Sequence, residues 1–158
     1  MFLRSTSRAK DRAVALAAVL YCLTGCSLFI GNAVDNAADN LTTAILNQDD
    51  PETVRDGAPA YLLLMDSLVE GAPQDPEILQ SASSLYAAYA AVFVEDPERA
   101  ARLAVRSRNY AARGLCETRK SGCGLVELPF DQVESRLAGF GQQDVDALYT
   151  LAVSWLVY

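Results

Sequence analysis

The stretch PEILQSASSLYAAYAAVF, residues 76–93, decides the fold because it carries no charge after its second residue. At 100° per residue, a helix over this stretch gathers its larger apolar side chains on one face. That face holds Ile78, Leu79, Ala82, Leu85, Tyr86, Tyr89 and Phe93. The other face holds Ser81, Ser84, Ala87, Ala88 and Ala91. A helix that is apolar or small all round is normally buried, so we predict a central helix with neighbours packed on both sides.

The tripeptide Asp-Pro-Glu occurs three times, at residues 50–52, 75–77 and 96–98. Each occurrence predicts the start of a helix. The aspartate side chain can accept from free backbone N–H groups. Proline suits the first helical position, and glutamate in the first turn complements the helix dipole. The spacing of the three starts favours antiparallel helices joined by short turns.

The rest of the chain also shows helical periodicity and no β alternation. We expect helices at 33–47, 59–69, 76–93, 97–115, within 128–140, and at 144–158. Gly57 and Pro59 should end a helical turn that begins at Pro51, because proline clashes with the preceding turn. Asp131 and Glu134 have the spacing of a capping box for the helix within 128–140. The predicted fold is all-α, an antiparallel helical array.

The last predicted helix, 144–158, has an apolar face at the end of the chain. That face holds Val145, Leu148, Tyr149, Ala152, Trp155 and Leu156. The sequence ends at SWLVY without a polar terminal turn. Helical arrays usually need a terminal unit with a polar outer face, so we expect residues 26–158 to be a domain that is incomplete at its C-terminus and self-associates.

The first 25 residues have the pattern of a targeting segment. Basic residues come first, at Arg4, Arg8, Lys10 and Arg12. The apolar run AVALAAVLYCL, residues 13–23, follows and is too short to span a bilayer. It leads into LTGC, residues 23–26, which resembles the lipobox of bacterial lipoproteins. We therefore predict a signal peptide at 1–25 and lipidation of Cys26. The alternatives are an ordinary signal peptide with an accidental cysteine, or a buried N-terminal helix.

Ser27 follows the predicted lipidation site and is of the type that permits sorting to an outer membrane. The predicted location is therefore the periplasmic side of a bacterial membrane, with the outer membrane favoured. The chain has a net charge of −7, and loss of a basic signal peptide would make it more acidic. Nucleic acid is excluded as an expected partner, because phosphate binding needs a basic surface.

The predicted roles of the four cysteines depend on this location. Cys22 would leave with the signal peptide and Cys26 would carry lipid, so Cys116 and Cys123 remain as a pair. Outside the cytoplasm such a pair favours a disulfide, although two free thiols stay possible. Two thiols without any histidine make a poor zinc site, so no metal or cofactor is expected. The absence of histidine also excludes Ser-His-Asp and Cys-His catalysis, and we predict no enzyme activity.

Two surface features are candidates for binding. A row of basic residues falls within about 60° on the helix 97–115, at Arg99, Arg102, Arg106 and Arg113. This arginine stripe could bind acidic groups of a partner or lipid phosphates; the alternative is a solvated face with internal ion pairs. Tyr86, Tyr89 and Phe93 could line an apolar ligand site; the alternative is that they belong to the core.

Three blocks of the sequence resemble one known family. They are DDPETVRDGAPAYLLLMDSLVEG (49–71), SLYAAYAAVFVEDPERAARL (84–103) and YAARGLC (110–116). They resemble the T-component family of tripartite ATP-independent periplasmic (TRAP) transporters, and the resemblance extends over 26–158. It implies a periplasmic lipoprotein with a helical array resembling tetratricopeptide repeats. It also implies homotrimers with a pore through each subunit, association with the solute-binding component, and a hydrophobic ligand. Family members are longer, which agrees with the expectation of an incomplete domain.

The expected function is therefore that of a membrane-anchored protein that assists a TRAP-type transporter by binding, without catalysis. One alternative is a general scaffold for protein interactions in the envelope, with no transported ligand. Another is an enzyme that acts on cell-wall sugars through two carboxylates. A cleft with two facing carboxylates would favour the enzyme.

Overall fold

The computed structural model describes residue 44 and residues 47–158, and its compact unit is Asp50–Tyr158. The helices are α2 (Pro51–Gly71), α3 (Pro76–Phe93), α4 (Pro97–Thr118), α5 (Phe130–Leu137) and α6 (Val145–Leu156). Short 3₁₀ turns lie at Lys120–Gly122 (η1), Leu125–Glu127 (η2) and Gln142–Asp144 (η3). The described part of the chain has no strand, so the predicted all-α fold is confirmed. The likeness to tetratricopeptide repeats stays a prediction.

Two predictions fall on residues that the structure does not describe. The signal peptide with Cys26 lies outside the described residues. So does the helix predicted at 33–47, apart from its residues 44 and 47.

The three Asp-Pro-Glu sites begin three helices, as predicted. The carboxylate of Asp50 accepts from the Glu52 N–H at 3.1 Å, and Asp96 does the same for Glu98 at 3.0 Å. Asp75 accepts from two backbone N–H groups, at 2.9 and 3.1 Å. The Thr53 hydroxyl and the Glu52 N–H together lower the pKa of Asp50 below its usual value. These caps are local, so each helix starts where its own sequence directs.

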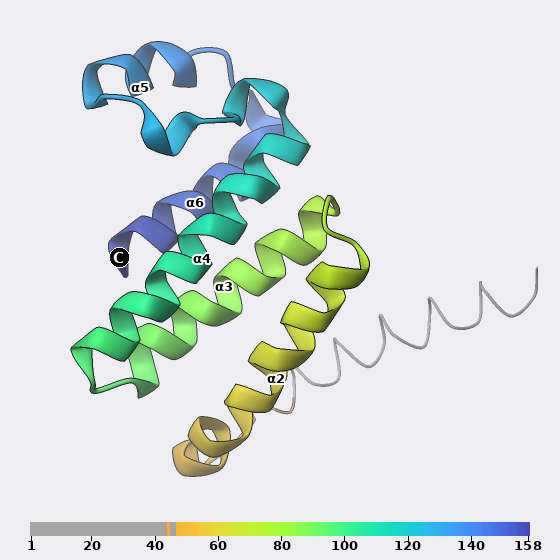
Figure 1. Cartoon of the computed structure of the whole chain (residues 1–158), viewed down its shortest axis with the longest axis vertical. Coiled ribbons are helices and arrows are strands. Elements are labelled where there is room, and N and C mark those ends of the chain that lie inside the picture. The colour runs from red at the N-terminus through yellow and green to blue at the C-terminus, as the bar shows by residue number, and fades with distance from the viewer. Residues whose placement is uncertain (1–43, 45–46) are drawn as a thin grey trace, which may run out of the picture. The chain divides into compact units, whose positions relative to one another are not determined.

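The helices form an antiparallel array with α3 at its centre (Figure 1). α3 lies between α2 and α4, and α6 packs antiparallel to α4 while also contacting α3. The segment with α5 extends beyond the end of α4. The predicted helix 76–93 matches α3 at both ends, and the predicted helix 97–115 is extended to Thr118.

Small residues let α3 and α4 approach closely. Ala104 and Ala111 in α4 are fully buried, and so are Ser83 and Ser107. The Ser107 hydroxyl donates to the Ser83 carbonyl at 2.8 Å, and the two hydroxyl oxygens lie 3.1 Å apart. Because the Ser107 proton is already used, Ser83 donates in the second bond. Both buried hydroxyls are therefore satisfied at the contact between the two helices.

The predicted central position of α3, with neighbours on two sides, is confirmed by α2 and α4, but most of its small face is not covered. Among the five residues of the small face, Ala87 is buried. The other four, Ser81, Ser84, Ala88 and Ala91, are exposed. Within residues 47–158, α2, α4 and α6 cover the other faces of α3 and leave this strip exposed. Small residues along one face of a helix show that another helix can approach that face closely. They do not show that another helix lies there.

The predicted break at Gly57 and Pro59 is also wrong, because α2 continues through both residues. Pro59 cannot donate to the carbonyl of Arg55, four residues earlier. Arg55 is exposed, so water can satisfy that carbonyl. Buried side chains on both sides of the proline, Ala58 and Leu62, hold α2 on the core. Packing therefore outweighs the local disadvantage of proline.

The predicted cap at Asp131 is wrong as well. α5 begins at Phe130, its N-cap is Pro129, and no side chain caps it. The fixed φ of Pro129 makes it the last extended residue, so Asp131 falls inside the first turn. α6 keeps its predicted periodicity, but its buried residues are Ala147, Leu151 and Ser154. The apolar face that we predicted points mostly outward, with Tyr149 69% and Leu156 86% exposed.

Candidate functional site

A polar cluster joins α2, α3 and α4. The Tyr86 hydroxyl of α3 donates to Asp66 Oδ2 of α2 at 2.8 Å, and the Tyr110 hydroxyl of α4 donates to Asp66 Oδ1 at 2.7 Å. Arg106 Nη2 lies 2.8 Å from Asp66 Oδ2. Arg106 Nε also donates to the Tyr110 hydroxyl at 3.3 Å. We call these four residues the Asp66 cluster.

The electrostatics of the Asp66 cluster keep its donors protonated. Burial, and then the hydrogen bond to Asp66, raise the pKa of Tyr86 and of Tyr110 above the ordinary tyrosine value. The bond to Tyr110 is the main cause of the raised pKa of Arg106. Both oxygens of Asp66 thus have donors, and the cluster is arranged to link helices.

The arginines of the stripe make hydrogen bonds and ion pairs within the molecule. Arg106 belongs to the Asp66 cluster, and Arg113 donates to the Pro73 carbonyl at 2.8 Å. Arg99 donates to the Tyr89 hydroxyl at 3.4 Å, with its guanidinium 5.5 Å from the ring centroid. Arg102 lies 3.9 Å from Glu98 and its side chain is 67% exposed. All four arginines are exposed, and Arg99 and Arg102 are the two whose guanidinium groups have only long contacts within the molecule.

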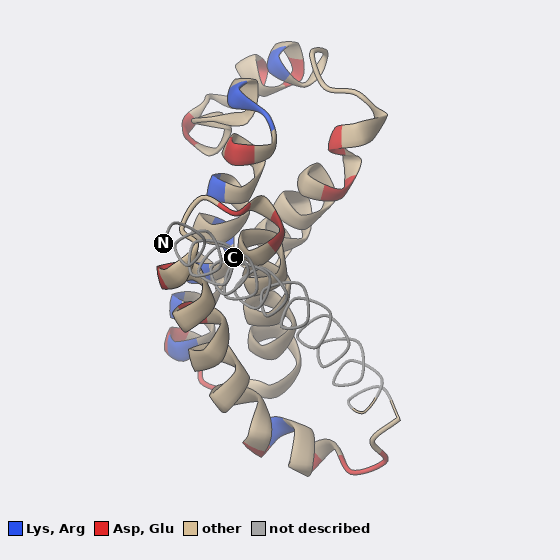
Figure 2. Cartoon of the chain, turned by 90° about the vertical axis from the view of Figure 1, so that its right-hand side faces the viewer, with Lys and Arg blue, Asp and Glu red and all other residues tan. Residues whose placement is uncertain are grey.

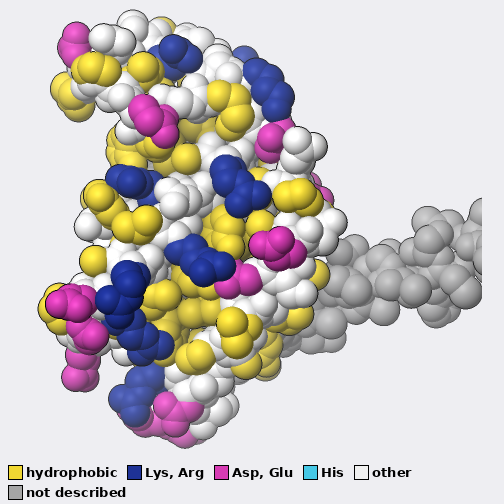
Figure 3. Space-filling model, in the orientation of Figure 1, with side chains coloured by type: hydrophobic (Ala, Val, Ile, Leu, Met, Phe, Trp, Pro, Cys, Tyr) yellow, Lys and Arg dark blue, Asp and Glu magenta, His cyan; other side chains and the backbone are white. Residues whose placement is uncertain are grey.

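The basic side chains share one face of the molecule. Figure 3 shows them following one another down the face on which α4 lies. Figure 2 shows most of the Lys and Arg positions gathered on one side of the ribbon. Acidic side chains are interspersed with them on the same face, so the potential is mixed rather than uniformly positive.

A groove of about 500 Å³ lies between the start of α2 and the connection from α3 to α4. Its lining consists of Arg55, Asp56, Pro59, Tyr89, Phe93, Val94, Glu95, Asp96 and Arg99. The rings of Tyr89 and Phe93 are 5.9 Å apart and tilted by 39°. The volume falls in the range of small-molecule sites. The groove brings together two of the three predicted aromatic residues and one arginine of the stripe, whereas Tyr86 lies in the Asp66 cluster.

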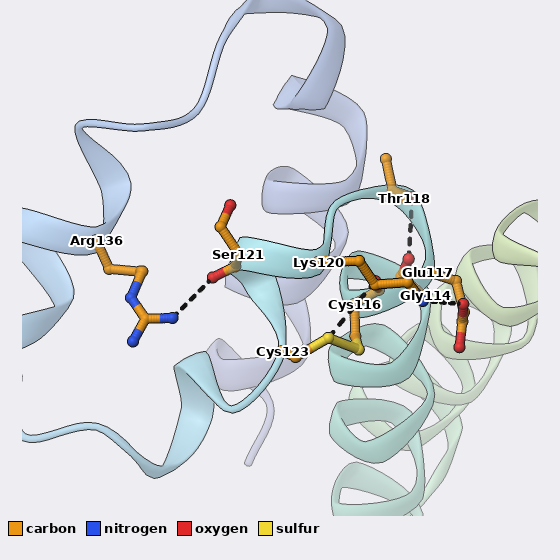
Figure 4. Close-up of a disulfide and its surroundings, with 8 residues drawn as sticks. All are labelled: Gly114, Cys116, Glu117, Thr118, Lys120, Ser121, Cys123 and Arg136. Atoms are coloured by element: carbon orange, nitrogen blue, oxygen red, sulfur yellow. Dashed lines mark hydrogen bonds and ion pairs between the residues drawn. A yellow bond between two sulfur atoms is a disulfide. The ribbon is translucent and has the colours of Figure 1, made fainter.

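A disulfide between Cys116 and Cys123 closes the turn at the end of α4 (Figure 4). Their Cα atoms are 4.3 Å apart. Next to it, Lys120 pairs with Glu117 at 2.6 Å, and Arg136 of α5 donates to the Ser121 carbonyl at 3.1 Å. The disulfide holds η1 against α4, and Arg136 ties α5 to the same turn.

A second ion pair fixes the start of α6. Asp144 is 2% exposed, accepts from the Gly141 N–H at 2.8 Å, and lies 2.7 Å from Arg119 Nε. Arg119 is the main cause of the lowered pKa of Asp144, and the Gly141 N–H adds to it. This pair joins the end of α4 to the start of α6 across the segment that contains α5.

Sequence reasoning did not single out Asp66, Arg119 or Asp144. The signal for Asp66 is its position as a lone acid within the apolar run YLLLMDSLV, residues 61–69. A charged residue at such a position is rarely buried unless it is paired. Asp144 carries no comparable signal, because it lies in a polar turn.

The described residues contain no cluster of three or more His, Cys, Asp or Glu side chains that could hold a metal ion. Within the same residues, no helix is long and apolar enough to cross a membrane. The features that the structure does contain define an all-α helical array with a polar cluster between its helices and an aromatic groove at one end.

Comparison with known protein families shows to which family this all-α protein belongs. The model of the TRAP transporter T-component family matches residues 47–158, and the chain belongs to this family. Searches of curated proteins and of solved structures gave no match. Membership gives the chain a role with TRAP transporters and indicates the bacterial envelope. The family consists of accessory transport proteins and is not known for catalysis.

Proposed function

We propose that this chain is a lipid-anchored periplasmic protein that assists a TRAP transporter by binding its solute-binding component. The family match over residues 47–158 carries this proposal. The mechanism is docking and transfer of a ligand, without bond chemistry. The groove and the arginine stripe supply the two surfaces that such a role requires.

The docking surface is centred on Arg99 and Arg102. Arg106 and Arg113 contribute little to it, because their guanidinium groups already serve Asp66 and the Pro73 carbonyl. An acidic patch on the solute-binding component would meet the two accessible arginines. Attraction between exposed charges is screened by salt, so the complex weakens as ionic strength rises.

The ligand surface is the groove, with Tyr89 and Phe93 as its aromatic side. Both come from the aromatic set Tyr86, Tyr89 and Phe93, whose remaining member, Tyr86, lies in the Asp66 cluster instead. A hydrophobic ligand would bury its apolar surface against these rings, and such burial contributes about 25 cal/mol per Å². We propose that this ligand passes between the chain and the solute-binding component.

The anchor is Cys26, exposed as a new N-terminus when the signal peptide 1–25 is removed. Two or more acyl chains there hold the domain at the periplasmic side of the membrane, with the outer membrane favoured. In this arrangement the domain from residue 26 onward assembles as a homotrimer. Replacing Cys26 with Ala tests the anchor in cells fed radiolabelled palmitate. Equal labelling of both proteins would disprove lipidation.

A pull-down tests the docking surface. Full-length protein with both Arg99→Glu and Arg102→Glu is compared with wild type, and the bait is the solute-binding component of the same organism's TRAP transporter. The matched control carries Lys120→Glu and Arg136→Glu, which change the charge equally near α5. We expect the first variant to lose at least about tenfold in binding and the control to keep it. Equal capture of all three proteins would exclude the stripe as the interface.

A further inference from the structure

We propose that the outward face of α6 pairs with the same face of a second copy of this chain, with the two helices antiparallel. The observation that carries this inference is a row of exposed side chains on α6 that is complementary to itself. The contact depends on neither the transporter partner nor the groove. It also differs from a three-fold contact, because a ring of three joins two different surfaces of each copy, whereas here α6 meets α6.

α6 has two apolar sides. The inner side is buried against the array and consists of Ala147, Leu151 and Ser154. The other side, which we call the outer row, consists of Val145, Tyr149, Ala152 and Leu156. Val145, Tyr149 and Leu156 are 53, 69 and 86% exposed, and Ala152 is exposed as well. A helix that is apolar on both sides normally has a neighbour on each, so the outer row is suited to a contact.

The spacing of the outer row fits a second helix. Its members follow one another at intervals of four, three and four residues. Two packed helices contact each other along a line on which apolar residues alternate at these intervals, 3.5 residues apart on average. The expected occupant of the outer row is therefore a helix.

The sizes of the side chains favour an antiparallel pair of identical helices. When two copies of α6 lie antiparallel and are centred on the outer row, Tyr149 of each copy faces Ala152 of the other. Val145 then faces Leu156. Each contact joins a larger side chain to a smaller one, which fills the space between the helices. In a parallel pair each residue would face its own counterpart, so the Tyr149 rings would crowd and the Ala152 methyl groups would leave a gap.

The charges also favour a second copy. The chain has a net charge of −7, yet Asp146 is the one charged side chain of α6. A surface that meets itself cannot carry many charges of one sign, because they would repel. In the antiparallel pair the two Asp146 positions are about 13 Å apart along the helices, beyond the screening length of about 10 Å at 0.1 M salt. The outer row also offers no cation to an anionic lipid surface, which makes a membrane the poorer occupant.

The contact is small, so the expected affinity is modest. α6 has 12 residues. It is therefore about 18 Å long, and one pair of such helices buries less than the roughly 800 Å² per partner of a standard interface. We expect a dissociation constant in the micromolar range. Two copies anchored in one membrane would have a higher effective concentration, which favours pairing there.

Light scattering on purified full-length protein, at micromolar concentrations and with Cys26→Ala to remove the predicted lipid, tests the pairing. Wild type should have twice the mass of Leu156→Glu, because the variant would bury an unpaired charge. Ala152→Tyr should also halve the mass, through crowding against Tyr149. Adding Tyr149→Ala to Ala152→Tyr should restore the mass, because the large and the small residue have only changed places. Phe130→Glu, at a 92% exposed site in α5, is the matched control and should keep the wild-type mass.

Cysteine cross-linking of the full chain in cells tests the direction of the pair. Position 152 lies near the two-fold axis, so Ala152→Cys should join two copies through a disulfide in the oxidising envelope. The two copies of position 156 lie about 16 Å apart along the antiparallel helices, so Leu156→Cys should not cross-link to itself. A parallel pair would cross-link at both positions and would overturn the antiparallel arrangement.

The outcomes separate this inference from the proposed function. Equal masses of wild type and folded Leu156→Glu would overturn the pairing, and if that mass is three chains, the proposed homotrimer stands. Tyr149→Glu replaces Leu156→Glu if circular dichroism shows that the latter is unfolded. A swap variant that stays at half the mass would also overturn it. So would a blue shift of Trp155 emission on phosphatidylglycerol vesicles without any doubling of mass, because the outer row would then face a membrane.

Discussion

The Tyr110 hydroxyl of α4 donates to Asp66 of α2 at 2.7 Å, across 44 positions of sequence. α2 has its larger contact with α3, and the bonds from Asp66 to Tyr110 and Arg106 add a direct polar connection to α4. One carboxylate thus links α2 to two other helices. α2 also forms one side of the groove, through Arg55, Asp56 and Pro59.

Asp66→Ala should lower the free energy of unfolding by roughly 2–4 kcal/mol. The change leaves two tyrosine hydroxyls without their acceptor, and unsatisfied buried polar groups cost about 1–3 kcal/mol each. The Arg106 side chain is 50% exposed, so water can replace the carboxylate there. Urea unfolding followed by circular dichroism measures the difference. Asp56→Ala, an exposed acid on the same helix, is the control and should change stability by less than about 0.5 kcal/mol. Similar losses for both variants would mean that the cluster is not a stabilising unit.

The Asp144–Arg119 pair should make stability depend on acid pH. Arg119 lowers the pKa of Asp144 below the ordinary value of 3.8, so the folded state holds the proton less tightly than the unfolded state. The stabilisation is therefore complete above about pH 5 and is lost as the pH falls below 3.8 through the folded pKa.

Asp144→Asn tests this dependence. The variant should be less stable than wild type at pH 7, and the gap should be narrower at pH 3, because that pH is below the ordinary pKa of 3.8 and the stabilisation declines there. The urea midpoints of both proteins at the two pH values give the comparison. A gap of the same size at both pH values would show that charge is not the cause.

Gly122 should not tolerate a side chain. A Cβ atom built there meets Leu115 Cγ at 2.7 Å and the Leu115 carbonyl oxygen at 3.2 Å, and Leu115 is fully buried. Gly122→Ala should therefore destabilise by about 1–3 kcal/mol through overpacking. Gly57→Ala is the matched control, because nothing lies within 4 Å of its Cβ position. In the interior of α2 it should stabilise by roughly 0.5–1 kcal/mol. Two changes of the same sign in thermal unfolding would contradict the packing argument.

The disulfide should be present in exported protein and should stabilise the end of α4. The closed loop is short, so replacing both Cys116 and Cys123 with Ser should cost roughly 2–3 kcal/mol. Mass spectrometry after alkylation without reduction should find neither thiol modified in the exported wild type. Two alkylated thiols would refute the prediction. The paired Ser variant also shows whether Arg136 keeps α5 ordered without the disulfide.

The sequence predicted helix starts correctly where the residues that determine the start lie within one helical turn. Asp75 has its cap, its proline and its glutamate within three residues, so both the start and the type of α3 were predictable. The break at Pro59 failed because it depends on what lies around the helix. The exposure of Arg55 and the burial of Ala58 and Leu62 allow α2 to continue, and both depend on the tertiary structure.

The candidate site was less predictable, because distant segments build it. Tyr89, Phe93 and Arg99 were identified by type and spacing and do share one groove. Tyr86 lies on the same predicted face of the helix as Tyr89. Its hydroxyl nevertheless donates to Asp66, twenty positions away in the sequence. The helical periodicity predicted for α6 was correct, but it did not show which face of α6 the other helices would cover. Helical spacing identifies a face, and only the tertiary arrangement shows what lies against it.

The outward face of α6 contains Trp155, which is 41% exposed and is the single tryptophan of the chain. Its indole fluorescence therefore comes from one place in the molecule. A half-exposed indole emits at longer wavelength than a covered one, so anything that comes to lie on α6 should shift the emission toward blue. The molecule has in this residue an intrinsic optical reporter, which needs no added label, for the surface that the helical array leaves open.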